Sequence, residues 1–458
     1  MPGSFRDPAG FVFRRGDRVF RQINRAGRED LARLVDSGLY EDLAGAGLLI
    51  PHRAADVEPA EPESADSVIE PEPIGFIAYP YEWCFGQLKA AALLTLEIER
   101  RAVARGLSLK DASAYNVQFR GHRPVFVDTL SFEAYEPGRP WAAYRQFCQH
   151  FLAPLALMAK VDIRLGELLR SRIDGIPLDL AAKLLPVGAR LRPSLLIHLV
   201  LHAGLQGKAS ARPAGPPAKS ATFGESAMLG LVENLKGAVE SLRFDPGRKG
   251  WAAYEKEHTY TPESWEHKAN FVASAVAASK PSTCWDLGAN TGRFSRVVSG
   301  LGVPTWSFDF DPACVEWSYR ESVRLDEANL VPLRMDLADP SPGGGWAHRE
   351  RSSLLDRGPA GLVLALAVVH HLAIANNVPL PSIAGFLARA GRWAVVEFVP
   401  KSDPQARRLL SAREDIFVDY DEEGFRRALE PHFRVHRREA VAVEGGERSL
   451  YLLERKGD

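Results

Sequence analysis

A strand that runs at once into a glycine-containing turn and a helix constrains this chain more than any other part of its sequence. Residues 283–292 read Thr-Cys-Trp-Asp-Leu-Gly-Ala-Asn-Thr-Gly, so an apolar strand meets an acidic residue at Asp286. Gly288 and Gly292 let the backbone turn tightly and approach a ligand without a Cβ in the way. The helix expected from Arg293 to Leu301 directs its free N–H groups at whatever occupies the turn. This pattern predicts a cofactor-binding strand, turn and helix.

The spacing of the turn favours one class of ligand over another. It reads D-x-G-x-N-x-G, whereas the dinucleotide fingerprint G-x-G-x-x-G seats a pyrophosphate. A carboxylate beside the glycines repels a pyrophosphate and attracts a cationic amino group, so the turn suits a zwitterionic ligand better than NAD. The stretch resembles motif I of the class I S-adenosylmethionine-dependent methyltransferases, (D/E)-x-G-x-G-x-G. The resemblance implies S-adenosylmethionine as the cofactor, held at its methionine part by Asp286, Gly288, Ala289, Asn290 and Gly292.

Acidic residues follow the next two expected strands, in the order in which that family places them. The run 303–310 ends in Asp309, which can accept hydrogen bonds from ribose hydroxyls, and Phe310 is expected to pack on the adenine. Asp311 precedes Pro312, and we expect it to cap the following helix. The strand 330–334 leads to Asp336. The resemblance implies that Asp336 receives the adenine amino group, with Leu337 beside it, although an ordinary turn carboxylate would look the same.

A fourth apolar run, residues 361–369, reads as a central strand buried on both faces, and His370 and His371 follow it. Its Ala365 and Leu366 are expected to line the cofactor site. Ligands of open α/β sheets lie beyond the carboxyl ends of the strands, so these histidines are the candidate catalytic residues beside a methyl acceptor. A neutral imidazole could take a proton from the acceptor, or the pair could only satisfy backbone groups. The Asn-Pro-Pro-Tyr type of sequence that grips a base in related enzymes is absent.

The remaining elements complete a seven-stranded Rossmann-like α/β sheet over about residues 250–458. A fifth strand is expected at 393–398, and the last two strands, at 432–436 and 449–453, are expected to form an antiparallel hairpin at the sheet edge. Helices are expected at 381–390, 405–413 and 422–429. The segment before the glycine turn carries Tyr254, Tyr260 and Lys268, which could cover the cofactor or the acceptor, or could anchor a surface helix.

Composition excludes several other classes of protein. The 458 residues carry a formal net charge of −1, which gives no global attraction to nucleic acid or to an anionic membrane. The 4 cysteines are far apart and lack metal-binding spacing, so we expect reduced thiols and no metal site. No apolar run reaches about 18 residues, and no secretory signal is recognisable at the N-terminus. We expect a cytoplasmic enzyme with a small-molecule substrate and no membrane partner; the oligomeric state stays open.

Two segments rich in proline and alanine divide the chain. Residues 52–73 read as an exposed acidic loop, and residues 207–226 as a linker with nothing to pack. We therefore expect an N-terminal α+β domain at 1–206, the linker at 207–226, and a methyltransferase domain at 227–458.

The N-terminal half carries a second pattern. A strand is expected at 75–83 and a long helix at 85–105. Asp111, Asn116 and Asp128 then follow at spacings of five and twelve, which resembles the catalytic loop and metal-binding strand of kinase-like phosphotransferases. The histidine expected two residues before the first aspartate is Leu109, and no glycine-rich phosphate loop precedes it. The resemblance implies a degenerate kinase-like domain with vestigial phosphotransfer residues; a simple hairpin with polar residues is the alternative.

The combination of the two halves resembles a bacterial group of class I methyltransferases, some of them nodulation-type host-specificity proteins. The stretches 370–379 and 397–403 carry this resemblance. We expect methyl transfer to a small molecule or a sugar derivative, with the acceptor atom undetermined. A phosphotransferase that uses Asp111 and Asp128, and a scaffold that binds cofactor without turnover, are the alternatives.

Overall fold

The protein divides into two compact units, which are described separately. The computed structural model describes residues 3–201, 224–247, 260–411, 413–444 and 446–457. The first unit comprises Met1–Asp245 and Gly345–Glu350, and the second comprises Pro246–Gly344 and Arg351–Asp458. Most of the linker expected at 207–226 lies outside the described residues, so its role as a boundary stays a prediction.

The first unit begins with a four-stranded antiparallel sheet in the order β1-β2-β4-β3. Its strands are β1 (Gly10–Arg15), β2 (Arg18–Asn24), β3 (His52–Ala54) and β4 (Ala65–Pro71), and η1 (Arg25–Gly27), α1 (Arg28–Asp36) and α2 (Leu39–Gly45) connect β2 to β3. The prediction of an exposed acidic loop at 52–73 was therefore wrong at both ends of that range, where β3 and β4 lie. Val68 and Ile69 point to opposite faces of β4 and enter two separate apolar clusters, and this burial outweighs the polar composition.

Two short antiparallel pairs follow, β5 (Leu107–Leu109) with β8 (Phe132–Ala134) and β6 (Val117–Arg120) with β7 (Arg123–Phe126). The strand expected at 75–83 is absent; the segment holds the short helix η2 (Pro80–Glu82) instead. Pro80 has no N–H to donate to a strand ladder, and the Glu82 carboxylate accepts from the Tyr79 N–H at 2.9 Å.

Helices make up the rest of the first unit. The long helix expected at 85–105 is confirmed as α3 (Phe85–Val103). The others are η3 (Ala114–Asn116), α4 (Tyr144–Phe147), η4 (Cys148–Leu152), α5 (Ala153–Lys160), η5 (Ile163–Glu167), α6 (Leu168–Ser171), α7 (Leu178–Leu184), α8 (Val187–Arg190), α9 (Pro193–Leu195), η6 (Leu196–Leu201) and α11 (Glu225–Ser241).

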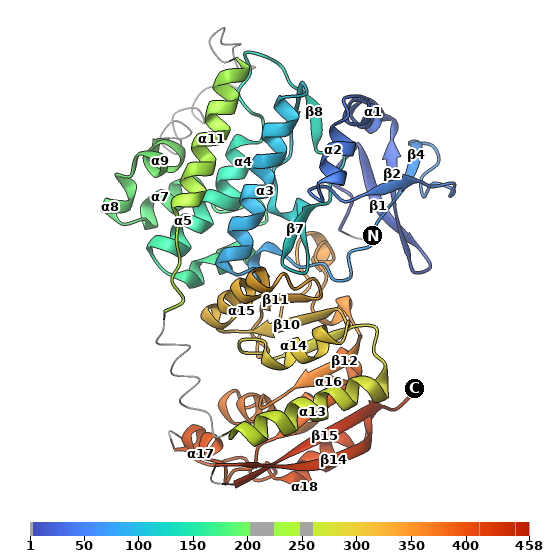
Figure 1. The fold of residues 1–458 in the computed structure, drawn as a ribbon, viewed down its shortest axis with the longest axis vertical. Helices are drawn as coiled ribbons and strands as arrows, with labels where there is room; N and C mark the ends of the chain where they lie inside the picture. The colour runs from blue at the N-terminus through green and yellow to red at the C-terminus, as the bar shows by residue number, and fades with distance from the viewer. Residues whose placement is uncertain (1–2, 202–223, 248–259, 412, 445, 458) are drawn as a thin grey trace. The chain divides into compact units, whose positions relative to one another are not determined.

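Helix α11 lies beside α3 in the first unit (Figure 1). The Lys89 ammonium on α3 donates to the carbonyl oxygens of Glu240 and Leu242, at 2.9 Å each. These bonds satisfy carbonyls at the C-terminal end of α11, where a cation is favourable. The sequence-based boundary at 226 grouped this helix with the residues that follow it, whereas its contacts are with the first unit.

The second unit contains the predicted seven-stranded sheet. Its order is β11-β10-β9-β12-β13-β15-β14, with the first five strands parallel and the last two antiparallel. The strands are β9 (Cys284–Leu287), β10 (Thr305–Asp309), β11 (Leu330–Arg334), β12 (Ala360–Ala365), β13 (Gly391–Phe398), β14 (Phe433–Val443) and β15 (Gly446–Arg455). The expected terminal hairpin, formed by β14 and β15, is thus confirmed. Within the sheet, β15 lies between β13 and the edge strand β14.

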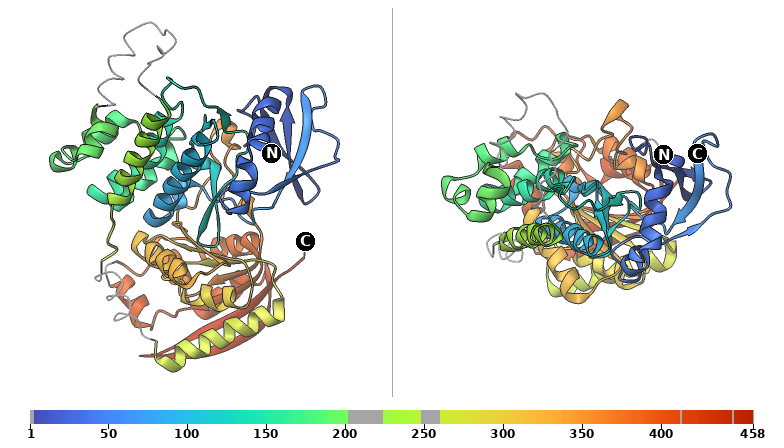
Figure 2. Two further views of the ribbon diagram at one scale, coloured as in Figure 1. Left: turned by 45° about the horizontal axis from the view of Figure 1, so that its top comes forward. Right: turned by 90° about the horizontal axis from the view of Figure 1, so that it is seen from above.

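Helices cover both faces of this sheet. On one face lie α13 (Pro262–Ser279) and α14 (Arg293–Gly300) (Figure 2). They pack on a core that includes Leu450 and Leu452 of β15. On the other face, Phe425 of α18 (Glu422–Leu429) packs against Tyr451, because successive strand residues point to opposite sides. The remaining helices of this unit are α15 (Pro312–Leu325), η8 (Leu355–Arg357), η9 (His371–Ala375), α16 (Leu380–Ala390) and α17 (Pro404–Leu410). The short helix η7 (Trp346–His348) belongs to the first unit, in its segment Gly345–Glu350.

The strand order defines where a ligand of this sheet should lie. The chain moves outward from β9 to β10 and β11, then returns to β12 on the other side of β9. Such a reversal opens a crevice outside the carboxyl ends of the two central strands, where ligands of open α/β sheets bind. The glycine turn follows β9, and the two histidines follow β12, so the predicted residues flank this point.

Across the described part of the chain, no helix combines the length and the apolar character needed to span a membrane. The cytoplasmic location stays a prediction.

Candidate functional site

The turn after β9 adopts a backbone that few side chains tolerate. Gly288, Asn290 and Gly292 have φ values of +74°, +53° and +80°. A Cβ on Gly288 would lie 2.3 Å from Cγ2 of Val368, and one on Gly292 would lie 2.7 Å from Oγ of Ser318. Asparagine is one of the few residues other than glycine that enters the left-handed region routinely, which explains how Asn290 replaces a glycine. The glycine turn therefore has the close approach that the sequence predicts.

Asp309 ties this turn to the end of β10. Its Oδ2 accepts from the backbone N–H of Asn290 at 2.7 Å, and its Oδ1 accepts from the N–H of Asp311 at 2.9 Å. Each carboxylate oxygen has a second lone pair, so the group can still accept from a ligand hydroxyl. The two loops at the carboxyl ends of β9 and β10 are thus held together by one side chain.

Two buried carboxyl groups lie beneath the turn. Asp286 is 2% exposed and accepts a hydrogen bond from Oγ of Ser295 on α14 at 2.6 Å. Burial raises the pKa of Asp286 to about 7, partly offset by Ser295 and increased further by Asp309. Burial likewise raises the pKa of Asp309 to about 6. The backbone N–H groups that donate to its carboxylate have the opposite effect and only partly offset this rise. A bound cation would favour the ionised forms of both groups, so the site has an electrostatic preference for a cationic ligand.

The amino end of α14 faces the turn without a capping side chain. Gly292 is its N-cap residue and makes no side-chain cap hydrogen bond. The Ser295 N–H of the first turn donates to the Asp286 carboxylate. The positive end of the helix dipole points at the turn, where it attracts an anionic group such as a carboxylate. A ligand that carries both an ammonium and a carboxylate would match the acids and the helix end together.

The other predicted cofactor residues lie on the same edge of the sheet. Phe310 is 61% exposed, which leaves its ring open to a flat partner. Asp336 is exposed, and its Oδ1 accepts from the backbone N–H of Ala338 at 2.8 Å, so it serves its own turn; Leu337 is half-buried beside it. Asp311 accepts from the N–H of Ala313 at 2.8 Å, which confirms the predicted helix cap.

The end of β12 carries the candidate catalytic histidines. Ala365 and Leu366 are buried there, and Ala367 has a φ of +53° before the chain reaches His370. His370 is 2% exposed, and within the described residues its Nδ1 has no hydrogen-bond partner. Burial lowers the pKa of His370 well below its usual value, and His371 and Arg448 lower it further. His370 is therefore neutral at physiological pH and keeps an unused ring nitrogen.

His371 differs from His370 in its surroundings. Its ring lies 4.1 Å from that of His370, and its residue surface is exposed. Desolvation by the surrounding protein lowers the pKa of His371 too, and the positive charge of Arg448 lowers it further. Because His371 is exposed and His370 is buried, only the ring of His370 is enclosed by the fold.

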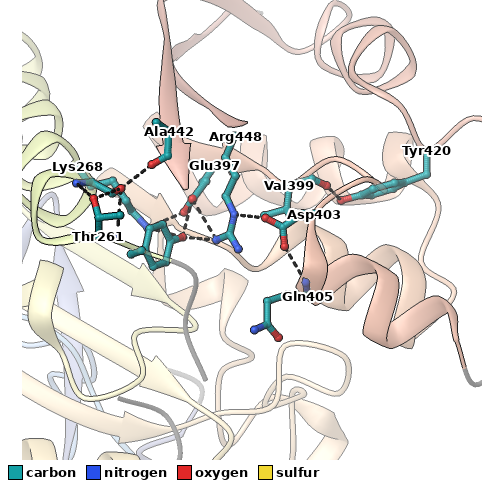
Figure 3. Close-up of polar contacts among 11 residues, drawn as sticks. Thr261, Lys268, Glu397, Val399, Asp403, Gln405, Tyr420, Ala442 and Arg448 are labelled. Atoms are coloured by element: carbon teal, nitrogen blue, oxygen red, sulfur yellow. Dashed lines mark hydrogen bonds and ion pairs between the residues drawn. The ribbon is translucent and has the colours of Figure 1, made fainter. Parts of the chain in front are cut away.

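A buried polar network joins α13 to the end of β13 (Figure 3). The Lys268 ammonium lies 2.6 Å from Oε2 of Glu397. The other carboxylate oxygen, Oε1 of Glu397, accepts from the Tyr260 hydroxyl at 2.6 Å. Lys268 in turn donates to the Tyr260 oxygen at 2.8 Å. Lys268 and Tyr260 were expected to cover a ligand or to anchor a helix; here both are bound to Glu397. Tyr254 lies outside the described residues.

Arg448 of β15 extends the same network. Its guanidinium donates to the Tyr260 hydroxyl, lies 3.4 Å from Oε1 of Glu397, and contacts Oδ2 of Asp403 at 2.7 Å. Asp403 also caps α17 through the N–H of Gln405 at 2.8 Å. Burial alone would raise the pKa of Glu397, but Lys268 and Arg448 outweigh it and lower that pKa. Two cations and two carboxylates are thus balanced in a site without water contact.

The sequence interpretation quoted Glu397 and Asp403 only as the ends of the stretch 397–403, without a role in a site, and did not name Arg448. An acid at the end of the fifth strand was the available signal, since it repeats the position of Asp286 and Asp309 on their strands. The structure also brings together the three residues of the first unit that were predicted as a vestigial phosphotransfer set. Asp111 is hydrogen-bonded by the Asn116 side chain, and Asn116 lies opposite Val127, the neighbour of Asp128.

Comparison with known proteins gives one extensive match. No protein-family model matches the sequence. Nodulation protein NoeA of Rhizobium meliloti (strain 1021) is 37% identical over 470 residues, which cover 99% of this chain and 96% of that protein.

Solved structures match only part of the chain. Magnesium protoporphyrin IX methyltransferase (ChlM) from Synechocystis PCC 6803, with bound SAH, has a TM-score of 0.33 and 14% identity and covers 45% of this chain and 95% of its own. The N-methyltransferase NodS from Bradyrhizobium japonicum WM9 has a TM-score of 0.31 and 9% identity, with 43% and 98% covered. At TM-scores this low, neither likeness assigns an activity to this chain.

Proposed function

We propose that this chain, which belongs to the family of nodulation protein NoeA, transfers a methyl group from S-adenosylmethionine to an acceptor beyond the carboxyl ends of β12 and β13. The observation that carries the proposal is the turn after β9. Gly288, Asn290 and Gly292 all have positive φ there, above the buried carboxyl groups of Asp286 and Asp309. A tight turn, two acids that favour a bound cation, and the positive end of the α14 dipole together suit an amino acid zwitterion.

The residues of the site fit the parts of this cofactor. Asp286 would accept from the amino group, the N–H groups of α14 would face the carboxylate, and Asp309 would accept from the ribose hydroxyls. Asp336 and Leu337 would border the adenine, Phe310 would stack on it, and Ala365 and Leu366 would line the opposite wall. When bound, the cofactor supplies an electrophilic methyl group on a sulfonium centre.

The chain's own contribution to the reaction is alignment and proton removal. Methyl transfer needs the acceptor lone pair in line with the methyl group, and holding two reactants in that geometry lowers the barrier by removing translational and rotational freedom. His370 Nδ1 is unpartnered within the described residues and neutral, so it can accept a proton from an acceptor hydroxyl or amine. We assign the role of base to His370, with His371 as the ring that packs against it.

The acceptor class follows from charge and from what the site lacks. The net charge of −1 gives no general attraction to nucleic acid, and the sequence lacks a base-gripping motif. We propose a small molecule or a sugar derivative. A phosphotransferase that uses the first unit, or a scaffold that binds cofactor without turnover, would be the alternatives.

Calorimetry with S-adenosylmethionine and S-adenosylhomocysteine tests the cofactor part of the proposal. We expect binding by the full chain and at least a tenfold loss in Asp286→Asn, which removes the carboxylate with little change of shape. The matched control is Asp311→Asn, because asparagine caps a helix as well as aspartate does and Asp311 serves as a cap here. Equal affinity in Asp286→Asn and the unaltered chain would overturn the proposal.

Transfer is tested with cofactor labelled in the methyl group. Cell extract is incubated with the full chain, and the labelled product is identified by mass spectrometry. A labelled small molecule that is absent with Asp286→Asn supports the proposal. Cofactor binding without any labelled product would favour the scaffold, and labelled nucleic acid or protein would overturn the acceptor class.

A further inference from the structure

One edge of the seven-stranded sheet is open to a further strand. β14 is the last strand in the sheet order and pairs on one side, with β15 (Figure 1). Beyond that pairing, the β14 backbone makes one hydrogen bond within the described residues, from Oγ of Ser264 to the carbonyl of Ala442. The N–H and C=O groups of every second residue point to the same side of a strand. Those of Ala440 therefore also point away from β15, and Ala440 is exposed.

A groove lies beside this edge. It has a volume of about 880 Å³ and is lined by residues of α18, by the first residues of β14 and by Lys456. Phe433 and Val435 contribute apolar surface, and Val435 is 44% exposed. The other lining residues are charged, with five cationic and three acidic side chains in total.

The cations of the groove exceed what its own carboxylates neutralise. Arg438 and Arg427 each pair with a glutamate of α18, at 2.7 Å and 3.1 Å. In the part of the chain that the structure describes, the side chains of Arg426 and Arg434 have no hydrogen bond or ion pair. The Lys456 ammonium donates to a backbone carbonyl, which does not neutralise its charge. The groove is therefore cationic, although the chain has a formal net charge of −1.

The charges on β14 itself select the kind of strand that can pair with it. The strand contains three arginines and one glutamate. Cationic side chains on an exposed edge commonly prevent pairing with another copy, because two such strands repel each other. The same charges attract a strand of opposite sign, so the edge discriminates between partners by charge. A second copy of this chain is disfavoured at β14, and an acidic extended segment is favoured.

A strand added to β14 would direct every second side chain towards the groove. Arg438 stands opposite Tyr451, whose ring packs on Phe425 of α18, so Arg438 lies on the sheet face that α18 covers. Side chains alternate between the two faces of a strand. Carboxylates at alternate positions of an added strand would therefore meet the cations of the groove, while its backbone pairs with β14.

We propose that β14 and the groove beside it bind an acidic, extended segment of a partner protein, which joins the sheet as a further strand. The outward N–H and C=O groups of β14 pair with the backbone of that segment. Arg426 and Arg434 pair with its carboxylates. This binding does not depend on methyl transfer.

Fluorescence anisotropy with labelled peptides and the full chain tests the proposal. The probe is a peptide of about eight residues in which glutamate and valine alternate, a common length for a strand. Two further peptides are compared with it. In one, lysine replaces glutamate; the other is fully N-methylated and has no backbone N–H to donate. We expect saturable binding of the acidic peptide and binding of both others that is weaker by about tenfold or more.

Variants separate the charges of the groove from the backbone of the edge. Arg426→Gln combined with Arg434→Gln should weaken binding of the acidic peptide about tenfold and reduce its dependence on salt. Arg407→Gln is the control, because Arg407 is exposed on α17 and does not line the groove. Ala440→Pro should abolish binding, because proline lacks the N–H that points out of the edge. If Ala440→Pro does not fold, the N-methylated peptide tests the same pairing.

The proposal is overturned if the acidic peptide does not bind, or if the lysine or N-methylated peptide binds as tightly. It is also overturned if the arginine double variant binds the acidic peptide as Arg407→Gln does. Single-stranded DNA is titrated as well, and binding as tight as that of the acidic peptide would replace the proposed partner by nucleic acid. Affinity for S-adenosylhomocysteine should be unchanged in the arginine double variant, so failure here and failure of the methyl-transfer proposal are distinguishable.

Discussion

The backbone N–H of Asn290 donates to the Asp309 carboxylate at 2.7 Å, and this bond fixes the left-handed turn after β9 to the end of β10. The turn and the neighbouring strand therefore cannot shift independently. Asn290 and Asp309 both belong to the candidate cofactor site, so single substitutions at either residue can test that site.

Substitutions at Asn290 should separate backbone strain from side-chain contacts. Asn290→Gly should keep cofactor affinity, because glycine adopts a φ of +53° freely. Asn290→Val should lose about tenfold or more, since a β-branched residue in the left-handed region is strained by about 1–2 kcal/mol. Calorimetry with S-adenosylhomocysteine measures both. Asn377→Val is the control, at a φ of +57° outside the turn; an equal loss of affinity there would contradict the expectation.

Cofactor affinity should depend on pH in a bell-shaped way. The pKa of Asp286, about 7, lies above that of a free carboxyl group, so the empty site holds a proton below pH 7. An ammonium ligand requires the ionised form, and affinity should fall up to about tenfold per pH unit below that value. On the alkaline side, an α-amino group loses its proton near pH 8. Calorimetry from pH 5.5 to 9.5 should find a maximum between these values, and Asp286→Asn should lose the acidic limb.

The same raised pKa should affect the stability of the empty protein. A carboxyl group with a folded pKa above its unfolded pKa stabilises the fold fully below the unfolded value, near 4, and this contribution is lost as the pH rises through about 7. Asp286→Asn should therefore raise stability more at pH 8 than at pH 5, as measured by urea unfolding. A difference that is equal at both pH values would contradict this assignment.

Breaking the buried network should destabilise the second unit strongly. Lys268→Met leaves the buried carboxylates of Glu397 and Asp403 with Arg448 as their one cation in the network, and loss of one partner of a buried ion pair typically destabilises a protein by about 3–5 kcal/mol. The double variant Lys268→Met, Glu397→Leu should lose less than the two single variants together, because the Arg448–Asp403 pair stays balanced.

Denaturant unfolding measures these changes, with Lys401→Met as the control. Lys401 pairs with Asp415 at 2.8 Å near the surface, where such pairs contribute about 1 kcal/mol at most. Similar losses in Lys268→Met and Lys401→Met would contradict the importance assigned to burial.

Removal of the candidate base should affect the rate and not cofactor binding. His370→Gln should lower kcat by about 10²–10⁴-fold, the usual contribution of a positioned base. The affinity for S-adenosylhomocysteine should stay unchanged, and His436→Gln, which loses an exposed contact with Glu454, is the control. The assay uses the acceptor found by methyl labelling. An unchanged kcat together with lower stability would assign His370 a structural role instead.

The strands of the parallel sheet could be predicted because they are short, apolar and buried, although the strand expected at 361–369 ends at Ala365, before the positive φ of Ala367. β11 and α18 begin and end at the predicted residues, and the turn was recognisable because only a few residue types tolerate its backbone. Asp311 could be assigned as a helix cap from its place before Pro312, since local geometry alone decides that role.

The buried network could not be predicted, because its members are far apart in sequence. Lys268 precedes Glu397 by 129 positions, and nothing local to α13 shows that its ammonium is paired inside the fold. The same holds for the ion pair of Arg21 and Asp128 in the first unit, in which Nη2 of Arg21 lies 2.6 Å from Oδ1 of Asp128. The strands β3 and β4 were not predicted, for another reason. Only two of their residues are buried, and in a stretch rich in proline and glutamate these are too few to produce the alternation of apolar and polar residues that marks a strand.

The placement of β15 has a consequence for biosynthesis. It is the last strand of the second unit along the chain, yet it is inserted between β13 and β14 and carries Arg448. While a ribosome is still translating residues before Gly446, β13 has an open edge and Asp403 lacks its cationic partner. Assembly of this half of the protein must therefore wait until that strand has emerged.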